Sequence, residues 1–214
     1  MTSFNADLYE ITIKKVELGV GRSGSSLTGT VYTLAVPPAA STTFDIASVA
    51  SGANVGSMGV KATKPSHVNK TFKYIRVTMN PIFKVGGKVT DDEDHTYYTN
   101  NQTKNEYGLL SCQKDGTEPT ELNGLYNFGF ADQTAGANGA SISGGAGSNT
   151  ETSVYQPSPG TFYWIAQLET EFTPNSFGYP SVSISFDTTN ALVVNTGESP
   201  TMRVSFPTIK VNIS

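Results

Sequence analysis

The sequence predicts an all-β protein, an antiparallel β-sandwich of the jelly-roll or immunoglobulin-like kind. The clearest observation is the segment SVSISFD, residues 181–187, in which Val182, Ile184 and Phe186 alternate with serines. A period of two with hydroxyl groups on one face is typical of a half-buried antiparallel strand. Similar alternation recurs along the chain, and no segment shows the period of about 3.6 residues of a long amphipathic helix. We expect about ten strands in one domain that spans residues 1–214.

The composition agrees with this fold class and excludes several functions. The chain has 214 residues, enough for one large sandwich or two small ones. Charged residues make up 15% of the chain, against a usual share of about 25%. A net charge of −4 with 14 basic residues argues against a nucleic-acid partner. The single cysteine excludes an intramolecular disulfide.

The first predicted strand, residues 8–18, changes the face on which its apolar residues lie. These residues have odd numbers before Lys14 and even numbers after Lys15. Such a switch predicts a β-bulge, or a strand that crosses between two sheets. A second strand is expected at 31–36 and ends at Pro37, which has no N–H group to donate to a ladder.

Residues 42–58 are the segment in which a short helical turn is expected. Asp45 is placed to cap the turn, with Ile46 and Val49 facing inward. The next strand is predicted at 71–79 and ends before an Asn-Pro turn.

The second half of the chain contains the longest predicted strand and the longest predicted loop. The strand covers 161–172, where bulky apolar residues keep one register. Residues 132–153 are rich in Gly, Ser, Asn and Thr, and are expected to form a flexible inserted loop. The closing segment, 201–214, changes face at Pro207, which predicts an edge strand or a bent strand.

The acidic segment VTDDEDHTYY, residues 89–98, is the one concentrated set of oxygen ligands. Asp91, Asp92 and Asp94 are candidate ligands for Ca²⁺, which prefers flexible loops that supply several oxygens. The alternative is a solvated acidic hairpin tip. The spacing favours the hairpin, because consecutive acids cannot all converge on one ion and the sequence lacks an Asp-x-Asp-x-Asp-Gly motif.

Catalytic sets are scarce, so we expect no enzyme activity and no cofactor. His67 lies in a polar connector, and the motifs Gly-x-Ser-x-Gly and His-Glu-x-x-His do not occur. Asp187 ends a strand and is expected to cap a turn rather than to act as in an aspartic protease. Glu169 and Glu171 lie two residues apart on one strand, whereas a glycosidase pair faces across a cleft. Cys112 is expected to be a buried, inert thiol.

Neither a signal peptide nor a membrane span is expected. The start MTSFNADLYEI lacks a basic segment followed by an apolar stretch. No segment approaches the roughly 18 consecutive apolar residues of a transmembrane helix.

Several segments resemble a family of bacterial secreted and surface β-sandwich proteins with no assigned activity. The matching pieces are YEITIKKVEL, FDIASVASGANVGSM, FKYIRVTM, and SVSISFD with the closing strand. The resemblance implies a structural role outside the cell or on a particle surface. The chain departs from the family in lacking a leader peptide and cysteine pairs, which favours a virion protein or a mature subunit without its leader.

We therefore expect a non-enzymatic structural subunit of a repetitive assembly, either a phage virion component or an extracellular filament. Copies are expected to join through strand edges at 8–18 and 201–214, with other virion or surface proteins or glycans as further partners. The alternative is a carbohydrate- or receptor-binding module on a cell or particle surface, which would use loop 132–153 and nearby tyrosines. The candidate tyrosines are Tyr97, Tyr98, Tyr107, Tyr126, Tyr155, Tyr163 and Tyr179.

Overall fold

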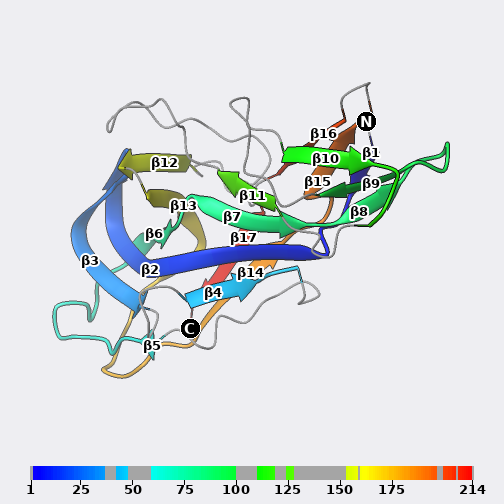
Figure 1. Ribbon diagram of the computed structural model, residues 1–214. Helices are drawn as coiled ribbons and strands as arrows, with labels where there is room; N and C mark the ends of the chain where they lie inside the picture. The colour runs from blue at the N-terminus through cyan, green and yellow to red at the C-terminus, as the bar shows by residue number, and fades with distance from the viewer. Residues whose placement is uncertain are drawn as a thin grey trace.

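The computed structural model confirms that the protein is all-β (Figure 1). It describes residues 2–36, 42–47, 59–99, 110–118, 124–127, 153–158, 160–196, 200–205 and 207–213. Within these ranges the regular secondary structure consists of seventeen strands, and every pairing is antiparallel. More strands form than the alternation predicts, since several are only two to four residues long. Residues 132–152 of the predicted loop lie outside the described residues, and Ser153 begins a strand.

The largest sheet has nine strands and is built around β2 (Leu8–Ser23). Its main path runs β11 (Gly124–Asn127), β7 (Ile82–Gly86), β2, β6 (Phe72–Met79), β13 (Thr161–Phe172) and β12 (Ser153–Ser158). Three further strands extend it beside β2, namely β3 (Ser26–Val36), β4 (Thr42–Asp45) and β5 (Gly59–Val60). The length of β2 allows four other strands to pair with it.

Two smaller sheets complete the described structure. The six-stranded sheet has the order β1 (Thr2–Phe4), β15 (Leu192–Asn195), β16 (Thr201–Val204), β10 (Leu110–Lys114), β9 (Thr96–Thr99) and β8 (Lys88–Thr90). The last sheet is a two-stranded ribbon of β14 (Val182–Asp187) and β17 (Thr208–Ile213). We call it the β14–β17 ribbon.

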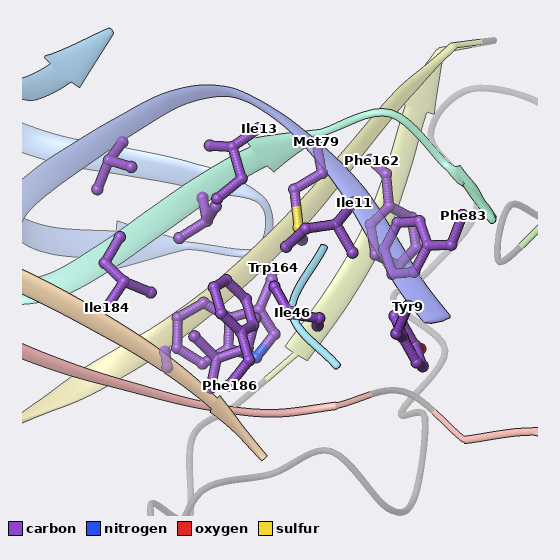
Figure 2. Close-up of a cluster of buried hydrophobic side chains, with 14 of the residues drawn as sticks. Tyr9, Ile11, Ile13, Ile46, Met79, Phe83, Phe162, Trp164, Ile184 and Phe186 are labelled. Atoms are coloured by element: carbon purple, nitrogen blue, oxygen red, sulfur yellow. The ribbon is translucent and has the colours of Figure 1, made fainter. Parts of the chain in front are cut away.

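The hydrophobic core joins all three sheets. Figure 2 shows Ile184 and Phe186 of the ribbon facing Trp164 and other buried side chains of the nine-stranded sheet. The six-stranded sheet contributes Leu192 and Met202, among others, to the same cluster. Ile184 and Phe186 are each 2% exposed, which confirms the core face predicted from SVSISFD. A sheet-on-sheet arrangement of this kind is a β-sandwich.

The predicted bulge in β2 is present. The register between β2 and β6 shifts between Ile13 and Lys15, whereas Ile13 pairs with Met79 and Val16 pairs with Val77. The extra residue allows both Ile13 and Val16 to point into the core, and both are fully buried.

The prediction that residues 8–18 form an edge strand is wrong. β2 pairs with β6 and β7 along one side and with β3 and β4 along the other. Residues 201–204 are also interior, because β16 lies between β15 and β10. Alternation of apolar and polar residues shows which face of a strand is buried, but it does not show whether its backbone edges are paired. The predicted change at Pro207 is sharper than the expected bend, because Pro207 separates two strands, β16 and β17, which belong to different sheets.

The predicted helical turn at 42–58 is wrong in its first four residues. Residues 42–45 form β4, which pairs with residues 10–13 of β2. The Asp45 carboxylate accepts the backbone N–H groups of Tyr9 and Ala47, both at 3.1 Å, so it caps the end of a strand. Ile46 faces inward as predicted. Val49 lies outside the described residues. Within the described ranges, no helix has the length and apolarity to cross a membrane.

Candidate functional site

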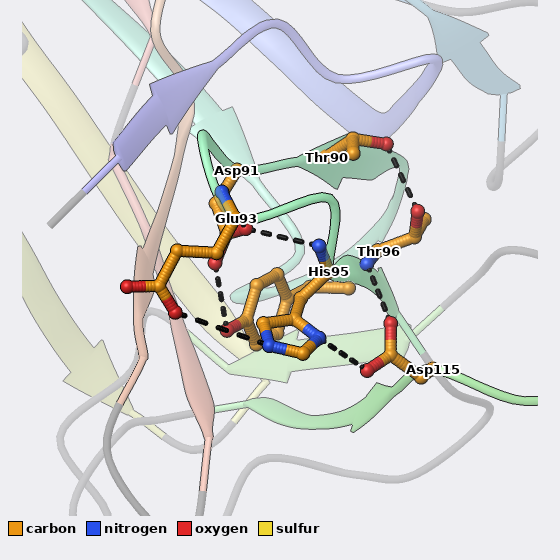
Figure 3. Close-up of polar contacts among 7 residues, drawn as sticks. Thr90, Asp91, Glu93, His95, Thr96 and Asp115 are labelled. Carbon is orange, nitrogen blue, oxygen red and sulfur yellow. Dashed lines mark hydrogen bonds and ion pairs between the residues drawn. The ribbon is translucent and has the colours of Figure 1, made fainter.

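The predicted acidic hairpin forms at the end of the six-stranded sheet, where β8 and β9 pair on either side of residues 91–95 (Figure 3). One oxygen of the Asp91 carboxylate accepts the N–H groups of Glu93 and His95, both at 3.0 Å. Its other oxygen accepts the Tyr97 hydroxyl at 3.1 Å. Asp91 therefore holds the turn together from the inside.

These contacts set the protonation of both partners. Desolvation raises the pKa of Asp91, but the hydrogen bonds from His95, Glu93 and Tyr97 outweigh it, and the resulting pKa is below the usual value. Burial, followed by the hydrogen bond to Asp91, raises the pKa of Tyr97 to about 12. Asp91 is thus an anion at neutral pH, and Tyr97 keeps its proton.

The structure does not assemble the predicted calcium site. Asp92 and Asp94 are exposed, whereas the Asp91 oxygens face the turn. Among the residues that the structure describes, no three His, Cys, Asp or Glu side chains form a group that could hold a metal ion. The observed arrangement is an acidic hairpin tip, the alternative that the spacing favours.

A contact that the sequence did not predict joins this tip to β10. The Nδ1 atom of His95 lies 2.7 Å from a carboxylate oxygen of Asp115, and the other oxygen accepts the Thr96 N–H at 2.8 Å. The hydrogen bond from Thr96, and to a smaller degree His95, lowers the pKa of Asp115 against the opposing effect of desolvation. Twenty residues separate the histidine from the aspartate, so no local motif marks the pair.

The side chains considered for catalysis have structural surroundings. Asp187 accepts the Thr189 N–H at 2.9 Å, which confirms the predicted turn. Glu169 and Glu171 are exposed, and Glu171 forms an ion pair of 3.2 Å with Lys73. Burial raises the pKa of the Cys112 thiol to about 11, which leaves little reactive thiolate at neutral pH.

Among the residues whose burial the structure describes, the most exposed large apolar side chains lie on the connection between β13 and β14. This connection, residues 173–181, is here called the aromatic loop. It carries Phe177, 68% exposed, and Tyr179, 76% exposed. Large exposed apolar side chains gathered at one place are typical of interaction sites.

Hydrogen bonds hold the aromatic loop against the connection that precedes β6, and the two run side by side in Figure 1. The Thr63 N–H donates to the Gly178 carbonyl at 2.7 Å, and the Asn69 N–H donates to the Pro174 carbonyl at 2.9 Å. The Thr173 hydroxyl donates to the Thr71 hydroxyl at 3.0 Å. The backbone that carries the two aromatic rings is therefore fixed.

A hollow of about 450 Å³ opens at this loop. Its lining combines two exposed aromatic rings with hydroxyl, amide and carboxylate groups. The lining residues are Thr63, Glu171, Phe172, Thr173, Pro174, Asn175, Ser176, Phe177, Gly178, Tyr179 and Pro180. Tyr179 is among the tyrosines predicted from the sequence to bind a carbohydrate or receptor, and Phe177 was not predicted. The signal for both is the run TPNSFGYPS, a loop composition that nevertheless contains two large aromatic residues.

Comparison with known proteins identifies no family, since no family model, curated protein or solved structure matches this chain. The resemblance to bacterial surface β-sandwich proteins therefore stays an expectation, and the folded structure is the basis for the function proposed below.

Proposed function

We propose that this protein is a non-enzymatic structural subunit of a repetitive assembly, a phage virion or an extracellular filament, in which copies join through the β14–β17 ribbon. One observation carries the proposal. Among the described strands, β14 and β17 pair only with each other, through the six residue pairs from Val182–Ile213 to Asp187–Thr208. Each strand therefore has an outer edge with backbone groups that no described strand pairs.

The ribbon is held firmly enough to act as a template. Its inner face buries Ile184, Phe186 and Ile209 in the core. A two-stranded ribbon is marginally stable without such packing. A strand added at either edge would extend an ordered ladder at a low entropy cost, because the ribbon already has the extended conformation.

The two open edges belong to different strands, and we propose that unlike edges meet between copies. The β14 edge of one copy would pair with the β17 edge of the next copy, and this contact is heterologous. Heterologous contacts produce closed rings or open filaments, according to the rotation between copies. The outer face of the ribbon carries Ser183, Ser185 and Asp187 on β14 and Thr208, Lys210 and Asn212 on β17, so it combines short polar side chains with one charge of each sign.

The test is the size of the purified protein over a wide range of concentration, measured by light scattering and electron microscopy. We expect rings, filaments or shells that dissociate on dilution. Asn212→Lys places a charge on an exposed position of β17, and charged side chains at edge strands oppose pairing. We expect this variant to remain monomeric at concentrations at which the unmodified protein assembles.

The matched control is Asn195→Lys. Asn195 is also an exposed asparagine on a strand, but it lies on β15, which has partners on both sides. This variant should assemble normally. A protein that stays monomeric at every concentration, or equal loss of assembly in both variants, would contradict the proposal.

A further inference from the structure

We infer that the aromatic loop and its hollow form a binding site for an uncharged carbohydrate, a site separate from the ribbon through which copies are proposed to join. Glycan binding is expected from the sequence on loop 132–153 and nearby tyrosines, but residues 132–152 lie outside the described part of the chain. The geometry points instead to residues 173–181, where Phe177 and Tyr179 are exposed beside a hollow of about 450 Å³. That volume is within the range of about 300–1,000 Å³ for small-molecule sites.

The aromatic rings have the right surroundings for sugar recognition. The apolar C–H face of a sugar ring packs on an aromatic ring, because both surfaces lose contact with water and the C–H groups meet the negative face of the π system.

Phe177 and Tyr179 flank Gly178, whose φ of +149° is a conformation that other residues rarely adopt. A Cβ atom on Gly178 would meet nothing within 4 Å, so the backbone conformation and not lack of space explains the glycine.

Backbone hydrogen bonds restrain the loop that carries the two rings. Thr63 and Asn69 donate backbone hydrogen bonds to the loop carbonyls, and Pro174 is buried. A preformed site loses less conformational entropy on binding than a mobile one. This matters for sugars, since their many hydroxyl groups exchange hydrogen bonds with water for hydrogen bonds with protein and gain little from each exchange.

The polar groups in the hollow match hydroxyl groups better than charged groups. The Asn175 amide and the Ser176 hydroxyl can each donate and accept hydrogen bonds, whereas the Thr173 hydroxyl, which donates to Thr71, can accept one. Among the described lining residues none is basic, and Glu171 is acidic. Lys73 lies next to the hollow, but it forms an ion pair with Glu171. A phosphate, sulfate or carboxylate ligand would find no unpaired cation in this described lining, so an uncharged sugar fits best.

The experiment measures binding of methyl glycosides of glucose, galactose and N-acetylglucosamine at millimolar concentration, by saturation-transfer NMR on the full chain. A panel of immobilised neutral and sialylated oligosaccharides extends the range. We expect at least one neutral sugar to bind, with weaker or no binding of its sialylated form. Phe177→Ala and Tyr179→Ala should each weaken binding about tenfold, as expected for residues that supply the main contacts.

Two variants serve as controls. Tyr179→Trp keeps an aromatic ring and should retain binding. Ile82→Ala removes another exposed apolar side chain, 45% exposed and on β7, and should bind as the unmodified protein does. Both alanine variants should keep the thermal midpoint of the unmodified protein, because the rings they remove are exposed.

Two outcomes would overturn the inference: no neutral sugar binds, or binding survives the double substitution Phe177→Ala and Tyr179→Ala. If no sugar binds and the double variant also loses self-association, the loop is assigned to a contact between copies. The Asn212→Lys variant separates this inference from the proposed assembly role, because it should lose assembly and still bind sugar.

Discussion

The imidazole ring of His67 stacks on the phenol ring of Tyr32, with the ring centroids 4.2 Å apart and the planes inclined by 24°. His67 is only 6% exposed, and its Nδ1 atom accepts the backbone N–H of Lys64 at 3.2 Å. Accepting this hydrogen bond requires an unprotonated Nδ1. Burial, together with the nearby charge of Lys64, lowers the pKa of His67.

The first prediction concerns stability against pH. Because the pKa of His67 is lower in the folded protein than in the unfolded chain, the unfolded chain binds more protons below the ordinary histidine pKa of about 6.5. The free energy of unfolding should therefore fall as the pH drops through this region. His67→Phe keeps a ring on Tyr32 but cannot be protonated, so its urea midpoint should change less between pH 8 and pH 5.5. An identical pH dependence in both proteins would contradict this account.

The second prediction concerns a buried ion pair in the nine-stranded sheet. Arg76 donates from Nε and Nη2 to one oxygen of Glu17, at 3.1 and 2.8 Å, and Glu17 is 5% exposed. Arg76→Met should reduce the free energy of unfolding by about 3 kcal/mol, because it leaves a buried carboxylate with Lys15 as its remaining ion-pair partner. The double variant Arg76→Met with Glu17→Gln should recover part of the loss. Urea unfolding provides the measurement, and equal stability of the single and double variants would argue against a buried-charge penalty.

The third prediction tests the anchoring of the ribbon. Phe186→Ala should lower the free energy of unfolding by about 3–5 kcal/mol, since it empties a buried site between the ribbon and the nine-stranded sheet. Ser183→Ala, on the exposed face of the same strand, should change it by less than about 0.5 kcal/mol. Thermal or urea unfolding of both variants checks this difference. Similar small effects would show that the ribbon is not packed on the core.

The fourth prediction concerns the acidic hairpin. The pKa values of Asp91 and Asp115 are lowered in the folded protein. The stability they contribute is therefore present above the ordinary aspartate pKa of about 3.9, and is lost as the pH falls through their folded values. Asp91→Asn should speed amide hydrogen exchange at Glu93 and His95 at neutral pH. Asp92→Asn is the control, because Asp92 is exposed and its loss should leave these rates unchanged.

The fifth prediction concerns the thiol of Cys112. Its pKa of about 11 means that little thiolate exists at pH 8. Alkylation by iodoacetamide should be about a hundredfold slower in the folded protein than in urea, since the thiolate is the reactive form. Mass spectrometry over time measures both rates. Equal rates would show that burial does not protect this residue.

Local patterns in the chain were enough to predict most strands and their buried faces. The alternation around Ile184 and the change of face at Lys14 depend on a few neighbouring residues, and the structure confirms both of them. The predicted strand at 161–172 has the bounds of β13. These features are readable because successive side chains of a strand point to opposite faces, wherever the strand lies in the sheet.

Relationships between distant segments could not be read in this way. The pairing of β2 with β6, the burial of His67 under Tyr32 and the contact between His95 and Asp115 each join residues 20 or more positions apart in the sequence. The anchored position of Phe177 likewise depends on hydrogen bonds from the connection before β6, about 100 residues earlier in the chain. A residue's face follows from backbone geometry, but its neighbours across a sheet follow from how the whole chain satisfies its hydrogen bonds and buries its apolar surface. The β17 edge lies in the segment 201–214 and Tyr179 is among the tyrosines predicted from the sequence, whereas the β14 edge and the role of Phe177 beside the hollow emerged from the folded structure.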